Sequence, residues 1–290
     1  MTKHTYGLTP AFVSGLISYL CAVVFLFFNV QWAAVTLSLF VLACLVAPFF
    51  PACGFFLPVI SRGRTGKNAV ALTFDDGPDP VSTPHLLRLL AKHRVPATFF
   101  VTGKNASRHP GLIHEIISAG HLIGNHTYRH DNFIMLKNSR LLKKEIESTR
   151  QILSKFGIVS RVFRPPAGIT NPRLGKILQE AGMVCVNFSR RAYDAGNRRV
   201  FKLSQRILKK VRANDIILLH DVPPKDERLF LYWLNEVELI ISGIIEKRLE
   251  ILPLYEIIGE PVMLNSESRC AICNPNRIKR GWKNPADRVI

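Results

Sequence analysis

Apolar residues divide this chain into two unlike regions. Residues 1–60 contain a single charged side chain, Lys3, and two long apolar runs, 11–30 and 33–50. From residue 69 onward the apolar runs are short and alternate with amphipathic stretches whose apolar positions recur at helical spacing. This pattern predicts an N-terminal membrane segment followed by a folded domain of alternating strands and helices.

The folded domain is expected to hold seven strands and six helices. The expected strands cover residues 69–76, 97–102, 121–125, 162–164, 183–188, 216–220 and 249–254. The expected helices cover residues 84–93, 110–119, 141–156, 172–181, 203–211 and 229–248. Strands that alternate with helices in this way predict a parallel α/β architecture.

The two N-terminal apolar runs are long enough to span a membrane or nearly so, because an α-helix rises ~1.5 Å per residue and the hydrocarbon core is ~30 Å thick. The residues between them, from Asn29 to Trp32, are polar enough for a turn, and Trp32 suits a membrane interface. A cleaved signal peptide is the alternative, but the basic segment before the first run is minimal and the apolar stretch is far too long. We therefore expect residues 1–60 to form a transmembrane hairpin of two helices, in a bacterial inner membrane.

The orientation of this hairpin follows from a few charges. Two spans put both ends on one side, where Lys3 precedes the first span and Arg62, Arg64 and Lys67 follow the second. The positive-inside rule then places the folded domain in the cytoplasm. A periplasmic or extracellular domain remains an open alternative.

The folded domain is strongly basic. Of the 39 Lys and Arg, 38 lie beyond residue 60, together with all 21 Asp and Glu. No nucleic-acid-binding motif accompanies this charge, so anionic lipid head groups or a phosphate on the substrate are the expected partners. Residues 61–260 are expected to form the catalytic domain and residues 261–290 a basic tail, with its positive charge at Arg277, Lys279, Arg280, Lys283 and Arg288.

Two neighbouring carboxylates, Asp75 and Asp76, stand where the first buried strand ends at Gly77 and Pro78. Like charges this close repel unless a cation or a proton separates their roles. One arrangement places one Asp on a metal and leaves the other as a base. A turn that carries two acids and no chemistry is the alternative.

The other candidate residues also follow predicted strands, and the carboxyl ends of parallel strands form the functional face of such folds. His126 and His130 have the spacing at which a helical turn would place both imidazoles on one metal. Arg164 follows the fourth strand and could pair with Asp75. Asp194 follows the fifth strand, and His220 ends the sixth as either a core histidine or a proton donor.

In this order the motifs resemble the polysaccharide deacetylases, carbohydrate esterase family 4 with the NodB homology domain. They are Thr73-Phe74-Asp75-Asp76-Gly77-Pro78, His126-Thr127-x-x-His130, Arg164-Pro165-Pro166-x-Gly168 and Leu218-Leu219-His220-Asp221. The resemblance covers about residues 68–258. It implies a distorted (β/α) barrel with about seven parallel strands and a divalent metal, commonly zinc.

The resemblance also implies a role for each candidate. Asp76, His126 and His130 would hold the metal, and Asp75 would be the general base, oriented by Arg164. His220 would be the general acid, with Asp194 as its partner, and a backbone N–H near Ala167 would help hold the oxyanion. The family often has Trp directly after the Asp that corresponds to Asp194, whereas this chain has Ala195, so one wall of the sugar groove is expected to differ.

The chemistry expected from this resemblance is metal-dependent removal of an N-acyl group, such as acetyl, from an amino sugar of an envelope polysaccharide or a lipid-linked glycan. A cytoplasmic site would suit deacetylation or deformylation of an undecaprenyl-phosphate-linked sugar, whereas a periplasmic site would favour peptidoglycan or another envelope polysaccharide. A tethered, non-catalytic glycan-binding module is the third interpretation.

Overall fold

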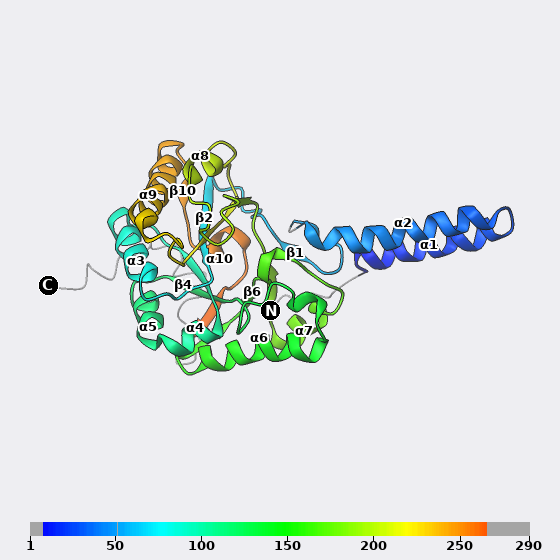
Figure 1. The fold of residues 1–290 in the computed structure, drawn as a ribbon, viewed down its shortest axis with the longest axis horizontal. Helices are drawn as coiled ribbons and strands as arrows, with labels where there is room; N and C mark the ends of the chain where they lie inside the picture. The colour runs from blue at the N-terminus through cyan, green and yellow to red at the C-terminus, as the bar shows by residue number, and fades with distance from the viewer. Residues whose placement is uncertain (1–7, 51, 266–290) are drawn as a thin grey trace.

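The computed structural model describes residues 8–50 and 52–265, and its folded domain is built on one curled sheet (Figure 1). The strands are β1 (Val59–Ile60), β2 (Ala69–Asp75), β3 (Thr98–Val101), β4 (Leu122–Asn125), β5 (Ile158–Ser160), β6 (Val162–Phe163), β7 (Val184–Val186), β8 (Arg190–Arg191), β9 (Ile216–His220), β10 (Glu250–Ile251) and β11 (Met263–Asn265). The sheet runs in the order β1-β7-β6-β4-β3-β2-β9-β8, and β10 pairs with β2. All of these pairs are parallel, which confirms the predicted distorted (β/α) barrel.

Helices surround the sheet in the folded domain and form a separate projection at the N-terminus (Figure 1). The helices are α1 (Pro10–Leu26), α2 (Val30–Val46), α3 (Ser82–His93), α4 (Gly103–Arg108), α5 (Pro110–Ser118), α6 (Ser139–Ser154), α7 (Leu174–Ala181), α8 (Leu203–Leu208), α9 (Phe230–Glu246) and α10 (Leu254–Ile258). Short 3-10 turns occupy Ala47–Phe49, Ile134–Leu136, Pro166–Gly168 and Glu227–Leu229. The seven predicted strands and six predicted helices are all present, with shorter bounds in most cases.

Strand β2 is the centre of the fold because every one of its seven residues is buried. A strand covered by helices on its outer face and by side chains on its inner face is mostly apolar, which is why Ala69 to Leu72 read as a continuous apolar run. The ring of Phe74 on β2 stacks on Phe99 of β3 with centroids 5.2 Å apart. Each such buried aromatic or aliphatic side chain contributes roughly 1.5–3 kcal/mol of transfer free energy.

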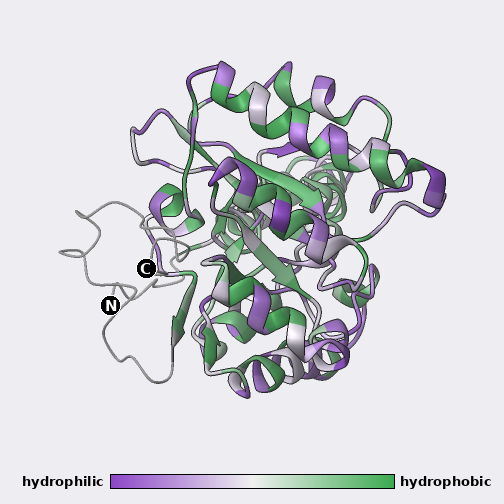
Figure 2. Cartoon of the chain, turned by 90° about the vertical axis from the view of Figure 1, so that its left-hand side faces the viewer, coloured by the Kyte–Doolittle hydropathy of each residue, from purple (hydrophilic) through white to green (hydrophobic). Residues whose placement is uncertain are grey.

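The outer helices are amphipathic, as Figure 2 shows by the alternation of hydrophilic and hydrophobic colours along them. On α3, Leu86 and Leu90 are buried while Arg88 between them is exposed. The helix ends at Arg94 in the left-handed conformation. The helix α7 ends at Gly182, where φ is +65° and a residue without a Cβ relieves the strain.

The N-terminal helices α1 and α2 lie side by side and project away from the domain (Figure 1). They pack closely at Gly15, where an added Cβ would come within 2.8 Å of Cζ of the Phe40 ring. The predicted turn was placed too late: α2 begins at Val30, and Asn29 caps it by accepting a hydrogen bond from the N–H of Gln31 at 2.8 Å. The side-chain cap decides this boundary, because it satisfies an N–H that the first turn of a helix leaves unpaired.

Within the described residues, one helical segment, Val30–Phe49, has the 20-residue length and apolar composition needed to cross a membrane, and α1 is apolar but shorter. Most large apolar side chains of both helices are exposed. A membrane anchor and an N-terminal signal sequence both fit a helix of this kind. The basic tail predicted at 261–290 lies outside the described residues from position 266 onward.

Several short elements were not predicted from the sequence. Strands β1 and β8 contain two residues each, and β8 consists of two arginines. Strand β11 pairs with β5 in a separate antiparallel ribbon. A two-residue strand is too short to show a period, so only its neighbours in the fold reveal it.

Candidate active site

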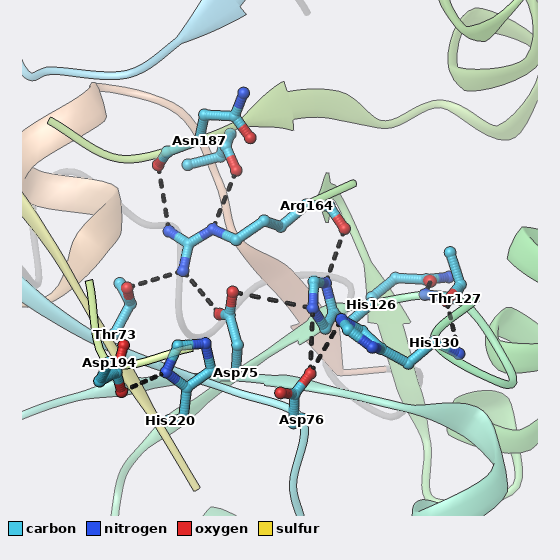
Figure 3. A network of polar contacts seen from close by, with 12 residues as sticks. Thr73, Asp75, Asp76, His126, Thr127, His130, Arg164, Asn187, Asp194 and His220 are labelled. Carbon is cyan, nitrogen blue, oxygen red and sulfur yellow. Dashed lines mark hydrogen bonds and ion pairs between the residues drawn. The ribbon is translucent and has the colours of Figure 1, made fainter. Parts of the chain in front are cut away.

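The candidate residues converge at the carboxyl ends of four strands of the sheet, the neighbours β2 and β9 and the neighbours β4 and β6. Asp75 ends β2 and lies in register with His220, which ends β9. His126 directly follows β4 and Arg164 directly follows β6, and the last residues of these strands are also in register. Parallel pairing therefore brings residues 145 positions apart to one edge of the sheet (Figure 3).

Asp76, His126 and His130 form a cluster with the geometry of a metal site. One ligand atom from each lies within 4.8 Å of the others. Oδ1 of Asp76 is 3.0 Å from Nε2 of His130 and 3.4 Å from Nε2 of His126. Two imidazole nitrogens and one carboxylate oxygen leave coordination positions open for water and substrate, as catalytic zinc sites do.

The environment of Oδ1 of Asp76 shows whether a cation would fit between these three residues. Oδ1 is buried and makes no hydrogen bond. Buried carboxylate oxygens normally accept hydrogen bonds, and one that accepts none and faces two imidazole nitrogens is suited to a positive ion. The donor set therefore fits a divalent cation.

The loop that carries the two histidines is not the helical turn that their spacing suggested. Thr127 and His130 have φ values of 64° and 54°, in the left-handed region. The N–H of His130 donates to Oγ1 of Thr127 at 3.2 Å, which tightens the loop. The two rings still meet, with centroids 4.8 Å apart, because the loop folds back on itself.

Burial and charge shift the pKa values within this cluster. Burial alone would raise the pKa of Asp76, but the two histidines and His220 outweigh it and hold the pKa well below its usual range. Burial and the neighbouring His126 lower the pKa of His130. For His126, burial would lower the pKa, whereas the charges of Asp75 and Asp76 raise it. An ionised carboxylate and a neutral imidazole are the forms that bind metal.

His126 is oriented by a backbone contact. Its Nδ1–H donates to the carbonyl of Arg164 at 2.7 Å. This bond fixes the tautomer and turns Nε2 toward Asp76 and toward Oδ2 of Asp75, which is 3.7 Å away. The sequence does not reveal this contact, since it joins a side chain to a carbonyl 38 positions away.

Arg164 is fully buried and holds Asp75 in place. Its Nη1–H donates to Oδ1 of Asp75 at 2.7 Å and to Oγ1 of Thr73 at 2.8 Å. Its other guanidinium nitrogens donate to the carbonyls of Val186 and Asn187. A buried guanidinium needs this full set of partners, and here all of its nitrogens have one.

His220 and Asp194 form a second oriented pair. Nδ1–H of His220 donates to Oδ2 of Asp194 at 2.7 Å, which leaves Nε2 for the pocket. Burial alone would lower the pKa of His220, but the bond with Asp194 and the nearby carboxylates raise it to about 9. An imidazolium that faces the pocket near neutral pH can donate a proton.

Together these residues surround a cavity of about 420 Å³, called here the catalytic pocket. Six of the seven predicted site residues line it, and Arg164 lies behind Asp75. Ala167, in the left-handed conformation at φ 55°, also lines the pocket. At the wall where the family often places Trp, Tyr193 is 66% exposed and the guanidinium of Arg191 lies over its ring at 4.4 Å.

The structure adds two supporting acids that were not predicted. Buried Glu145 on α6 accepts the N–H groups of Tyr128 and Arg129 through Oε2, at 3.0 and 2.7 Å, and so holds the loop between the two histidines. The sequence signal that could have identified Glu145 is an acidic residue at one of the buried positions of an amphipathic helix. Asp221 is fully buried and accepts hydrogen bonds from Ser82 and Thr83, while burial raises its pKa to about 7.

Comparisons with known proteins agree with this geometry. Residues 62–186 match the sequence profile of the polysaccharide deacetylase family. A chitooligosaccharide deacetylase of Sinorhizobium fredii is 38% identical over 173 residues, which cover 59% of this chain and 80% of that protein. A peptidoglycan-N-acetylglucosamine deacetylase of Bacillus cereus is 36% identical over 157 residues, which cover 53% of this chain and 73% of that protein.

Solved structures of deacetylases also resemble this chain. A crystal structure of a peptidoglycan N-acetylglucosamine deacetylase superposes with a TM-score of 0.64 at 30% sequence identity, covering 70% of this chain and 94% of the other. The chain therefore belongs to the polysaccharide deacetylase family, whose active deacetylases hydrolyse C–N bonds of acetylated sugars and depend on a metal.

Proposed function

We propose that this protein is a membrane-anchored, zinc-dependent deacetylase that removes the N-acyl group from an amino sugar of an envelope glycan. One observation carries the proposal: a buried carboxylate held by Arg164, an imidazole held by Asp194 and a three-residue metal cluster all face one pocket. The relatives named above deacetylate chitooligosaccharide and peptidoglycan, which supports an acetylated amino sugar as the substrate.

Asp76, His126 and His130 would hold the metal. The chemistry supplied by a cation at this site is Lewis acidity toward the acyl oxygen and a lowered pKa for water, toward ~7 for zinc. Two nitrogen donors and one oxygen donor in a compact set favour zinc over calcium or magnesium, which prefer oxygen ligands alone.

Asp75 would act as the general base. Its Oδ1 is held by Arg164, and its Oδ2 points toward the metal cluster. It accepts a proton from the attacking water as the new C–O bond forms. The fixed guanidinium holds the carboxylate in one orientation before the substrate arrives.

His220 would act as the general acid. Its raised pKa keeps the ring protonated near neutral pH, and its Nε2–H donates a proton to the amine as the C–N bond breaks. A backbone N–H near Ala167, which lines the pocket, would help hold the oxyanion. The products are a free carboxylate and the amino sugar.

The two apolar helices would anchor the enzyme. Most of their large apolar side chains are exposed, an arrangement that is stable in lipid and costly in water. Accessibility of an engineered surface cysteine to a membrane-impermeant reagent in intact cells tests the predicted cytoplasmic side. Labelling from outside would contradict that orientation.

The catalytic proposal is tested by separating metal binding from turnover. Asp75→Asn is expected to retain bound zinc while acetate release from N-acetylated chitooligosaccharide falls about 10²- to 10⁴-fold, the range of general acid–base catalysis. His126→Ala is expected to lose both zinc and activity. Metal content by mass spectrometry and acetate release by an enzymatic assay give the two measurements.

The matched control is Asp226→Asn, which removes an exposed carboxylate that pairs with Arg228. It should leave both measurements unchanged. Turnover of Asp75→Asn at the wild-type rate would refute the role of Asp75, and a wild-type protein that binds zinc but releases no acetate would favour the glycan-binding module.

A further inference from the structure

A second hollow, the basic pocket, adjoins the catalytic pocket. It is formed by Ala52 and by residues 61–62, 188–193 and 206–212, and has a volume of about 600 Å³. Seven of its twelve lining residues are Lys or Arg, and none is Asp or Glu. A concave surface of one charge sign concentrates its field on an oppositely charged group.

The positive charge of this pocket is only partly balanced. Buried Asp215 lies beneath it and pairs with both Arg62 and Arg190, one carboxylate for two guanidinium groups. In the segment directly after α8, Lys209, Lys210 and Arg212 are exposed. A solvated cluster at a helix C-terminus would explain these lysines alone, because cations are favourable there. It does not explain why arginines from two other segments face the same hollow.

The basic pocket lies at the seam of the curled sheet. Strands β1 and β8 are the two ends of the strand order. Ser61 and Arg62 follow β1, and Arg190 and Arg191 form β8, so the pocket opens between the two edges. The remaining side is closed by Arg206 on α8 and by residues after α8.

The seam is also the place where the N-terminal hairpin joins the domain (Figure 1). Ala52, which lines the pocket, lies three positions after the apolar segment Val30–Phe49. The N–H of Ala11, at the start of α1, donates to the carbonyl of Phe55 at 3.0 Å, so both helices meet the domain at this point. If the hairpin spans a bilayer, the pocket lies at the level of the lipid head groups.

The two pockets adjoin and share part of their lining. Phe188, Arg191 and Tyr193 line both of them. The guanidinium of Arg191 lies between the pockets, stacked on the ring of Tyr193. An extended ligand can therefore contact both pockets across Arg191 and Tyr193.

We infer that the basic pocket binds the phosphate of a lipid phosphate ester that carries the acylated amino sugar. This inference rests on the proposed function, because it places the sugar in the catalytic pocket. The phosphate then lies among the arginines and lysines, and the lipid chain follows the hairpin into the membrane. Arginine and lysine are the side chains that bind phosphate through charge-assisted hydrogen bonds.

The experiment compares two substrates on the full-length protein in detergent. One is N-acetylglucosamine joined to citronellol through a phosphodiester, and the other is tri-N-acetylchitotriose, which has neither phosphate nor lipid. The variant Lys209→Glu/Lys210→Glu reverses two exposed charges of the basic pocket. The matched control Lys144→Glu/Lys155→Glu reverses two exposed charges on and just after α6, outside both pockets.

The measured quantity is the ratio of kcat/KM for the phosphate-linked substrate to that for chitotriose. In the basic-pocket variant this ratio is expected to fall about tenfold or more, because attraction is replaced by repulsion at a phosphate. The control variant is expected to keep the wild-type ratio. An unchanged ratio in the basic-pocket variant, with the wild type active on chitotriose, would overturn the inference and leave the proposed function intact.

Two further outcomes are decisive. If the wild type, loaded with zinc, deacetylates neither substrate, the proposed function fails and the inference fails with it. If added phosphatidylglycerol stimulates the wild type on both substrates but not the basic-pocket variant, while the ratio stays unchanged, the pocket serves bulk membrane lipid. That result would overturn the assignment of the phosphate to the substrate.

Discussion

The two adjoining pockets use charge in opposite ways. In the catalytic pocket, charges of both signs are buried and paired, as in the contact of Arg164 with Asp75 and that of His220 with Asp194. In the basic pocket, Lys209 and Lys210 are exposed and surrounded by charges of their own sign. The first arrangement fixes a few atoms in position, whereas the second produces a field that attracts an anion and allows it to move.

This difference has an energetic consequence. A buried charge depends on its partner, because removing one member leaves the other unsolvated. An exposed lysine keeps its water, so its replacement costs little. Function and stability should therefore be coupled in the catalytic pocket and separable in the basic pocket.

The largest effect is expected for Arg164→Met. The change leaves buried Asp75 without its ion-pair partner, which costs about 3–5 kcal/mol in comparable cases. In a domain of this size that corresponds to a fall in Tm of roughly 6 to 20 °C. Thermal unfolding in detergent gives the measurement, and Arg129→Met, which removes an arginine side chain that is 76% exposed, is the control.

A second variant shows whether the pair is responsible for this loss. Asp75→Asn/Arg164→Met removes both charges and should recover part of the Tm lost in the single variant. Equal Tm values for Arg164→Met and Arg129→Met would refute the contrast between buried and exposed charges. The buried pair would then contribute no more to stability than a surface charge does.

An intermediate effect is expected for Asp194→Asn, and it concerns pH. The raised pKa of His220, about 9, means that the acid form is present below this pH and lost above it. Removing the carboxylate lowers the pKa, so the alkaline limb of the kcat/KM profile should move to lower pH by about 1 to 3 units.

The pH profile is obtained by measuring acetate release from chitooligosaccharide between about pH 6 and about pH 10. A variant that is slower at every pH but has an unmoved alkaline limb would show that Asp194 only positions the ring. A limb that moves to higher pH would refute the sign of the electrostatic coupling.

The smallest effect is expected for Lys210→Gln in the basic pocket. The side chain is exposed, and surface substitutions of this kind change stability within about 0.5 kcal/mol. Its Tm should therefore match that of the wild type. A loss comparable to that of Arg164→Met would mean that the basic pocket is part of the folded core rather than a ligand surface.

Much of the fold could be predicted because local sequence carries the information. Strand β2 begins with a continuous apolar run, Ala69 to Leu72, and α3 shows an apolar stripe beside charged positions. The boundary errors have local causes that are stereochemical rather than hydrophobic. Asn29 starts α2 by capping it, and the histidine loop uses two left-handed residues where a helical turn was expected.

The candidate site was predictable to a smaller extent. Motif order and strand ends indicated which residues would gather, and the structure places Asp75, Asp76, His126, His130 and His220 around one pocket. The supports were not predictable, since Glu145 acts on backbone N–H groups 16 and 17 positions away. Such contacts depend on how the helix α6 lies against the loop, which no spacing along the chain records.

The sequence by itself determined the alternating elements, the apolar N-terminus and the residue types that meet at the strand ends, because burial and chain geometry are local constraints. Only the tertiary structure decided that residues near 52, 62, 190 and 209 share a basic pocket and that this pocket joins the catalytic one. The physical reason is that these segments meet across the open seam between β1 and β8. The position of that seam follows from the curl of the whole sheet.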